Sequence, residues 1–467
     1  MTMNDHTKED VMSTIDTVVS ALKSGFSGTV IQPGDPTYDA TRSVMPGGID
    51  MHPGVIARPQ SAADVQRVVA VARDTGVQFA IRSGGHSAAG YSTSEGGLVL
   101  DLRDMKAISV DASGKTLTAQ AGATALEVTK AALEQGMIVG FGDTGSVGIS
   151  GITLGGGVGY LSRKLGLTID SLRSAEVVTA DGKLLTASAN ENPDLFWALR
   201  GGGGNFGVAT SLTYALEPLP AFTGGMMCLP ATPETVAGFV AAAHAAPEAL
   251  STIANVMPAP PLPFLPPEVH GKLVILGMLA FAGPDAEAQL ALAPFRALAK
   301  PYADFVKPGP YTQMYPPEDP NYKPTASART MFMDRIGQAE AKTIVDTLAA
   351  SDAPFRAVQI RVLGGAIARV PADATAYAHR KAPIMLNLVA FYTTPEDKLK
   401  RDAWVEGFVA TLTQETKGAY VNFLAAEGDA RIRAAYPGGT WERLRRIKRQ
   451  YDPQNLFRLN QNIAPAA

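Results

Sequence analysis

The stretch GDTGSVGISGITLGGGVGY, residues 142–160, is one of three glycine-rich segments in the first half of the chain. The others are RSGGHSAAG (82–90) and LRGGGGNFGVAT (199–210). Glycine lets backbone amides approach a ligand closely and adopt positive φ, so such turns present several N–H groups to a pyrophosphate. One such cluster alone is usually a tight turn between strands. Three of them within about 130 residues, each next to a β-rich run, favour an extended ligand bound by the backbone.

A dinucleotide is the obvious candidate for that ligand, but the Rossmann fingerprint is not in its required place. The segment GGGVGY (155–160) does not follow a clear strand, and no acidic residue stands at the distance expected of a βαβ unit. The sequence therefore calls for another dinucleotide-binding fold.

The pattern along the chain changes twice. From about 52 to 217 strand-like and helical patterns alternate; for example, SAADVQRVVAVARDTG (61–76) has a serine cap, helical apolar spacing and a terminal glycine. Between about 218 and 416 the proline-rich stretches 257–268 and 307–324 accompany β-rich runs and helical patterns, which indicates a second lobe. In the C-terminal segment that follows, a basic helical pattern precedes a polar end.

Composition excludes several classes of function. The 467 residues, 46% of them apolar and 18% charged, fit a soluble globular protein of two or three lobes, and the net charge of −3 gives no reason to expect nucleic acid or an anionic membrane as a partner. The N-terminus lacks the apolar segment of a signal peptide and no run of about 18 apolar residues occurs, so we expect an unexported, cytoplasmic protein without a membrane span. A single cysteine, Cys228, rules out an intramolecular disulfide, and the six histidines lack metal-ligand spacing. We therefore expect no metal site.

Five motifs occur in a specific order and together carry a resemblance. They are SGGHS (83–87), VGISGITLGGGVGYLSRKLGLTIDS (147–171), ENPDLFWALRGGGGNFGVAT (191–210), YVNF (420–423) and YDPQNLFRLNQNI (451–463). In this order the chain resembles the berberine bridge enzyme family of the vanillyl-alcohol-oxidase-type flavoproteins, from about residue 50 to 463. The resemblance implies an α+β fold with a two-part FAD-binding domain, residues 1–217 and 417–467. The inserted α/β substrate domain, residues 218–416, would place an antiparallel sheet covered by helices over the isoalloxazine ring.

The resemblance also implies a covalent flavin. It places His86 at the flavin 8α-methyl carbon, where a neutral imidazole is a suitable nucleophile and the link should make the flavin a stronger oxidant. Many relatives add a second link from a cysteine in a C-x-x-V-G segment, but here TGSVG puts Thr144 at that position. We therefore expect single attachment, as in the hydroxynicotine-oxidase-like branch, and interpret Cys228 as a buried apolar residue.

Further contacts to the cofactor follow from the same motifs. Val147 stands where the family controls access of dioxygen to the reduced ring, and valine there is typical of oxidases. Tail residues of YVNF and the final motif are expected at the ring and its edge, and the GNFGV segment near the adenine. The resemblance assigns the following cofactor-binding residues: Arg82, Ser83, Gly84, Gly85, His86, Ser87, Gly142, Asp143, Thr144, Val147, Gly148, Ser150, Gly151, Gly156, Gly157, Gly159, Gly204, Gly207, Val208, Tyr420, Asn422, Asn460 and Asn462.

The catalytic base is an open question in this sequence. Oxidation of a carbon that bears a hydroxyl needs a group that accepts the hydroxyl proton, whereas a neutral amine needs none. In many relatives the last residue of YVNF is a tyrosine that serves as this base, but here it is Phe423. Tyr420 and Tyr392 are the preferred candidates beside Tyr377 and His379, and Tyr392 is equally well explained as an ordinary sheet aromatic.

The function implied by the resemblance is that of an FAD-dependent oxidase. It would transfer a hydride from a CH–OH or CH–NH centre of a small metabolite to the flavin and pass the electrons to O2, forming H2O2. The alternatives are a dehydrogenase of the same fold with another electron acceptor and a flavin-free binding protein. The sequence identifies neither the substrate nor the oligomeric state, although aromatic residues in the proline-rich loops favour a partly apolar substrate: Phe264, Tyr311, Tyr315 and Tyr322.

Overall fold

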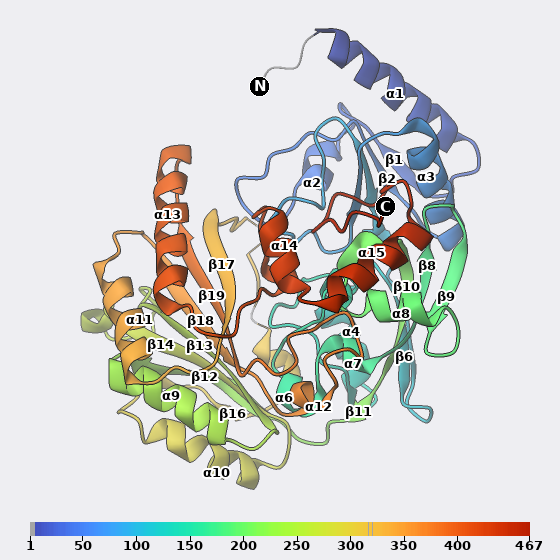
Figure 1. Cartoon of the computed structure of the whole chain (residues 1–467). Coiled ribbons are helices and arrows are strands. Elements are labelled where there is room, and N and C mark those ends of the chain that lie inside the picture. The colour runs from blue at the N-terminus through green and yellow to red at the C-terminus, as the bar shows by residue number, and fades with distance from the viewer. Residues whose placement is uncertain (1–4, 316, 320) are drawn as a thin grey trace.

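The first of the protein's main sheets lies near the N-terminus. The computed structural model describes residues 5–315, 317–319 and 321–467 (Figure 1). The sheet has the strand order β1-β2-β4-β3, in which β4 is parallel to both neighbours. Its strands are β1 (Thr29–Ile31), β2 (Val55–Arg58), β3 (Phe79–Arg82) and β4 (Leu98–Asp101).

Helix α3 (Ala62–Thr75) packs between this sheet and the next one. It forms where the 61–76 pattern predicted a helix: Ser61 and Asp64 make a capping box at its start, and Gly76 ends it with a φ of 66°. Its buried valines pack between β4 on one side and strands of the second sheet on the other. Helix α1 (Asp5–Lys23) contacts α3 from outside.

The second sheet is antiparallel and has the order β5-β6-β10-β8-β9. Its strands are β5 (Ile108–Asp111), β6 (Thr116–Gln120), β8 (Leu172–Val178), β9 (Leu184–Ser188) and β10 (Val208–Ala215). Between them the chain makes helices α4 (Ala125–Leu133), α5 (Ile149–Leu154), α6 (Ser162–Leu165), α7 (Thr168–Ser171) and α8 (Pro193–Leu199). Two of the glycine-rich segments, 142–160 and 199–210, are thus connections around these short helices, and the third, 82–90, is the loop that follows β3.

The third sheet is the largest and forms the second lobe. Its antiparallel strands run in the order β15-β12-β14-β13-β18-β19-β17, with β16 paired to β12 at the edge. They are β12 (Thr223–Pro230), β13 (Leu250–Pro258), β14 (Leu273–Phe281), β15 (Ala303–Asp304), β16 (Lys307–Pro308), β17 (Ala326–Met333), β18 (Arg356–Val362) and β19 (Ile384–Phe391). The helices that cover one face of it are α9 (Pro233–Ala245), α10 (Asp285–Arg296), α11 (Gln338–Ala350) and α13 (Pro395–Leu412).

The C-terminal segment returns to the first lobe. After α13 the chain forms a short turn at Val421–Phe423, then α14 (Asp429–Ala435) and α15 (Gly439–Tyr451), and α15 packs on α8 (Figure 1). Phe457 and Ile463 are buried in the same core as α3 and α8. The end of the chain therefore completes a core that its first half begins.

The domain boundaries expected from the sequence are 217/218 and 416/417. The first lies inside β11 (Glu217–Pro218), which pairs with β7 (Met137–Ile138), and the second lies between α13 and the return to the first lobe. We propose these three segments as the domains. None of the helices in the described part of the chain is long and apolar enough to cross a membrane.

Candidate functional site

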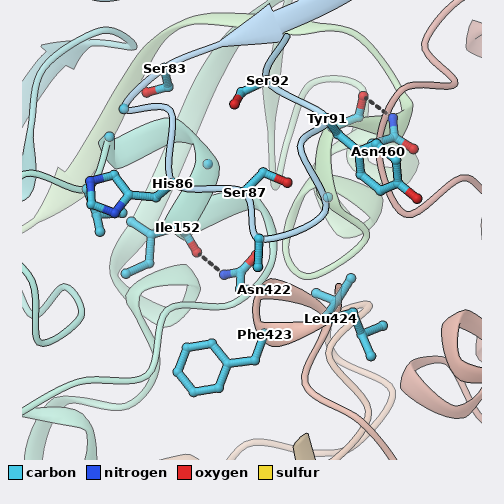
Figure 2. Close-up of a pocket in the computed structure, with 18 of the residues that line it drawn as sticks. Ser83, His86, Ser87, Tyr91, Ser92, Ile152, Asn422, Phe423, Leu424 and Asn460 are labelled. Carbon is cyan, nitrogen blue, oxygen red and sulfur yellow. Dashed lines mark hydrogen bonds between the residues drawn. The ribbon is translucent and has the colours of Figure 1, made fainter. Parts of the chain in front are cut away.

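A cavity of about 450 Å³ lies where the two lobes and the C-terminal segment meet (Figure 2). The loop after β3 and the segment before α5 form one part of its wall. Ala328 of β17 and Asn387 of β19 reach it from the large sheet, and residues 420–424 and 459–461 reach it from the C-terminal segment. Stretches from both ends of the chain and from its middle thus share one hollow.

A second cavity of about 130 Å³ adjoins the first. It extends along the start of β10, where Gly207 and Val208 line it. The two cavities share the following lining residues: Ile81, Ser83, Gly151, Gly204, Leu459 and Asn460. Together they offer an extended space along the glycine-rich segments.

The loop after β3 is held from beneath by Arg82. This side chain is fully buried, and its guanidinium donates hydrogen bonds to the backbone oxygens of Ser92, Thr41 and Arg42. Burial lowers the pKa of Arg82 to about 10, against the opposing effect of Asp101. Arg82 therefore fixes the loop and does not itself line the cavity.

His86 stands on this loop with its ring at the cavity wall (Figure 2). Its Nε2 lies 2.8 Å from Ser146 Oγ. The Ser146 hydroxyl also bonds to Glu318, and the Ser146 N–H donates to the same carboxylate at 3.1 Å. Burial lowers the pKa of His86, so the imidazole is neutral at neutral pH and keeps one nitrogen lone pair.

The loop of His86 and the loop before α5 touch backbone to backbone. A Cβ added to Gly84 would lie 2.2 Å from the backbone nitrogen of Gly148, and one added to Gly148 would lie 2.0 Å from Ser83 Oγ. Gly151 and Gly204 differ, since an added Cβ there meets only open space although both residues line the cavities. The first two glycines are needed for packing, and the other two leave room for a ligand.

The C-terminal residues bring amides and a phenol to the cavity. Asn422 Nδ2 donates to the Ile152 carbonyl and to the Tyr420 hydroxyl, both at 3.0 Å, and the Gly157 N–H donates to the same hydroxyl at 2.9 Å. Burial raises the pKa of Tyr420, so this phenol keeps its proton at neutral pH. Its oxygen already accepts two hydrogen bonds.

Three polar atoms at the cavity have no partner among the described residues: Ser92 Oγ, Asn387 Oδ1 and Asn460 Oδ1. Such buried atoms cost free energy unless a ligand or water bonds to them. Asn460 Nδ2, in contrast, donates to the carbonyls of Gly204 and Phe457, which fixes the side chain at the junction of the two cavities. The cavity wall therefore offers hydrogen-bonding atoms to a polar ligand.

The large sheet contributes a neutral polar surface. Asn255, Gln359 and Asn387 stand opposite one another on neighbouring strands, and Gln359 Nε2 donates to Asn255 at 3.0 Å. Arg361 pairs with Asp143 from the first lobe and lies 5.2 Å from the ring centroid of Phe423. Because Asp143 is paired, the charge that it brings to the cavity is compensated.

Two family models match the chain: the FAD binding domain model over residues 53–188 and the berberine and berberine-like model over residues 419–464. An uncharacterized FAD-linked oxidoreductase of Bacillus subtilis, YgaK, is 32% identical over 461 residues, which cover 95% of this chain and 98% of that protein. The chain belongs to the berberine bridge enzyme-like FAD-linked oxidoreductases.

Oxidases of known structure resemble this FAD-linked oxidoreductase over nearly its whole length. (R)-6-Hydroxynicotine oxidase of Paenarthrobacter nicotinovorans is 29% identical, covering 95% of this chain and 98% of its own. The crystal structure of 6-hydroxy-D-nicotine oxidase from Arthrobacter nicotinovorans superposes with a TM-score of 0.83 at 26% identity, covering 95% and 99%. Glucooligosaccharide oxidase from Acremonium strictum, with a 6-S-cysteinyl, 8α-N1-histidyl FAD, gives 0.83 at 26%, covering 97% and 100%. The predicted fold and enzyme class are confirmed.

The cavities of this FAD-linked oxidoreductase fit its cofactor. Glycine backbones with open space at Gly151 and Gly204 line the two adjoining cavities. Asn460 Oδ1, which has no partner among the described residues, lies where they meet. These groups suit a dinucleotide, whose phosphates accept hydrogen bonds from backbone N–H groups and whose hydroxyls donate to amide oxygens.

Most of the predicted cofactor residues come together at these cavities. Those lining the larger one are Ser83, Gly84, Gly85, His86, Ser87, Gly142, Asp143, Thr144, Val147, Gly148, Gly151, Gly204, Tyr420, Asn422 and Asn460. The smaller one adds Ser150, Gly207 and Val208.

Six predicted residues line neither cavity: Arg82, Gly156, Gly157, Gly159, Tyr392 and Asn462. Gly156 and Gly157 pack beneath Tyr420. Tyr392 follows β19 and is half-buried beside Gly48 and Lys398, so the structure does not bring this candidate base to the cavity.

The proline-rich loops differ from expectation. Tyr311 and Tyr315 are buried in a core cluster, Phe264 and Tyr322 are exposed, and none of these rings lines the cavity. Glu318, a described residue of these loops, reaches the site through its hydrogen bond with Ser146. Sequence reasoning also missed Asn387 and Arg361, which carry no motif and gain their place only from the pairing of distant strands.

Proposed function

We propose that this FAD-linked oxidase oxidises a CH–OH or CH–NH centre of a small metabolite, with the flavin attached through His86 alone and reoxidised by O2 to H2O2. When bound, the flavin supplies the hydride acceptor. One observation carries the proposal: the ring of His86 stands at the wall of a cavity lined by the glycine loops on one side and by the large sheet on another.

Single attachment is supported by the absence of a suitable thiol. Thr144 lines the cavity at the position where many relatives carry the second linking residue. The chain's one cysteine, Cys228, is fully buried in β12 beneath other residues, and burial raises the pKa of its thiol to about 11. A covalent link at the cavity therefore rests on the imidazole of His86.

The cavity favours a substrate centre that carries no positive charge, such as an alcohol or an uncharged amine. Among the described residues that line it, Asp143 is the one carboxylate, and Arg361 neutralises it. Asn387 Oδ1 has no partner among the described residues and can accept a hydrogen bond from a substrate O–H or N–H, while Ala328 and Phe423 supply apolar surface. Val147 at the same cavity supports access of dioxygen.

The phenol of Tyr420 is poorly suited to accept a proton from an alcohol. Its raised pKa means that it is already protonated, and its oxygen accepts hydrogen bonds from Gly157 and Asn422. This environment orients the residues of the C-terminal segment and favours a substrate that needs no strong base, such as an amine that enters uncharged.

His86→Ala tests the attachment. We expect the wild-type protein to be yellow and to keep its flavin after acid precipitation and denaturing electrophoresis, whereas His86→Ala releases all its flavin under these conditions because the nucleophile is gone. His52→Ala, which removes an exposed histidine outside the cavity, is the matched control and should keep the bound flavin. Acid-stable flavin in His86→Ala would refute the assignment.

The oxidase step is tested on the same protein. A screen of amines, alcohols and sugars for peroxide formation identifies the donor class. Mixing substrate-reduced enzyme with air-saturated buffer in a stopped-flow instrument measures reoxidation, for which we expect a fast return of the oxidised flavin spectrum. Slow reoxidation would favour a dehydrogenase, and a colourless preparation a binding protein.

A further inference from the structure

We propose that Ser146 and Glu318 form a proton relay that prepares His86 for its covalent bond and accepts the imidazole proton as the bond forms. This inference rests on the proposed attachment through His86. It gives a role to a carboxylate from the second lobe that belongs to none of the motifs.

The hydrogen bonds fix the direction of the relay. The Glu318 carboxylate accepts both the backbone N–H of Ser146, at 3.1 Å, and the Ser146 hydroxyl proton. A serine hydroxyl has one proton, so once it points to Glu318 the Ser146 oxygen only accepts. His86 Nε2, 2.8 Å away, must then be the donor.

This arrangement selects one tautomer of His86. With the proton on Nε2, the lone pair of the neutral ring is on Nδ1, which is the form of a nucleophile that bonds through Nδ1. Burial lowers the pKa of His86 and outweighs the opposing effect of the Glu318 charge, so the imidazolium, which has no lone pair, is disfavoured. The geometry and the burial thus act in the same sense.

The relay also balances the protons of the reaction. Attachment replaces one C–H bond of the flavin 8α-methyl group and the N–H bond of the imidazole by one C–N bond. This change releases two protons and two electrons, which dioxygen takes up as H2O2. The imidazole proton leaves Nε2 for Ser146 Oγ as the hydroxyl proton of Ser146 passes to Glu318.

Glu318 is placed to pass this proton on. Glu318 is exposed to solvent, whereas His86 is only partly exposed. The carboxylate therefore connects the imidazole ring to solvent. The negative charge of Glu318 also acts on the His86 ring, because it raises the pKa of the imidazole. Ser146 and Glu318 are therefore positioning and proton-accepting residues for the attachment, separate from substrate oxidation.

The test measures the rate of covalent attachment and not turnover. Full-length apoprotein, produced in riboflavin-depleted cells, is mixed with saturating FAD under air, and acid-stable flavin is followed over time by fluorescence in denaturing gels. We expect Glu318→Gln and Ser146→Ala to slow attachment by about 100-fold, the lower end of proton-transfer effects. Total flavin retained after desalting should match the wild type. Ser146→Thr, which keeps a hydroxyl, should restore the rate.

Glu95→Gln is the matched control, since this exposed carboxylate pairs with His52 outside the cavity, and it should attach flavin at the wild-type rate. A wild-type rate in Glu318→Gln or in Ser146→Ala would overturn the relay. That failure is distinguishable from failure of the attachment itself, which acid-labile flavin in the wild type or acid-stable flavin in His86→Ala would show.

Discussion

Lys448 shows how a single buried charge ties the end of the chain to the cofactor lobe. Its ammonium is fully buried, and it donates to Asp452 and to the carbonyls of Asn205 and Phe457. Asn205 lines the larger cavity and Phe457 the smaller one. One side chain therefore holds both the glycine-rich segment and the last motif in place.

Lys448→Met should destabilise the protein by about 3–5 kcal/mol, because it leaves Asp452 buried without its partner. Chemical denaturation with the flavin bound measures the change. The control is Lys183→Met, since its pair with Asp181 is exposed and should be worth less than about 1 kcal/mol. Equal losses for the two variants would contradict this role for Lys448.

At the level of single residues, the sequence predicted those site residues that lie within its motifs. His86, Thr144 and Asn422 lie in contiguous segments whose residue types already limit their roles, and all three line the cavity. Glu318 and Asn387 were not predictable, because their roles depend on contacts with residues far away in the chain and on strand pairing. Tyr392 was chosen on its residue type alone, and the fold places it elsewhere.

Among the elements, helix α3 is tied to the chain that precedes the first sheet through Asp64. This carboxylate is buried and accepts hydrogen bonds from the N–H and hydroxyl of Ser27 and from the N–H groups of Gln60 and Ser61. Burial alone would raise the pKa of Asp64, but the hydrogen bonds, those from Ser27 first, outweigh it and lower the pKa. The helix start therefore needs an ionised Asp64.

Asp64→Asn should cost about 1–3 kcal/mol at neutral pH, because the amide meets several donors with only one acceptor oxygen. Since the folded pKa lies below the ordinary value, the stabilisation is fully present above about pH 4 and is lost as the pH falls through the folded pKa. Denaturation of both proteins at pH 7 and pH 3 should show a smaller difference in acid. A difference that grows in acid would contradict the assignment.

The elements were predictable where the signal is local. The 61–76 pattern became α3, and the β-rich runs expected between about 218 and 416 became strands of the large sheet, among them β14 and β19. The order of strands in the large sheet was not predictable, because β13 lies beside β18 through pairing over about 100 residues. Local patterns specify elements, and their neighbours depend on the whole chain.

For the whole molecule, the pair of Arg361 and Asp143 joins the two lobes across the cavity. Arg361 is buried in β18 of the large sheet, whereas Asp143 belongs to the segment before α5 and its side chain is 26% exposed. The guanidinium also donates to the Val158 carbonyl of the first lobe. The substrate sheet is thus fastened to the cofactor side at the site itself.

Arg361→Met should destabilise the protein by about 1–3 kcal/mol, less than for a fully buried pair because solvent reaches Asp143. Asp143→Asn added to this variant should recover part of the loss, since the unpaired charge is then removed. A double-mutant cycle in chemical denaturation measures the coupling. Strictly additive effects would contradict a direct link between the lobes.

The burial of Cys228 has a consequence for the lifetime of an enzyme whose proposed turnover releases peroxide. Peroxide attacks the thiolate form of cysteine, and burial together with the raised pKa keeps Cys228 protonated inside β12. The chain has no other cysteine. Peroxide formed in turnover therefore meets no reactive thiol in the enzyme, and the burial of Cys228 protects the protein from thiol oxidation.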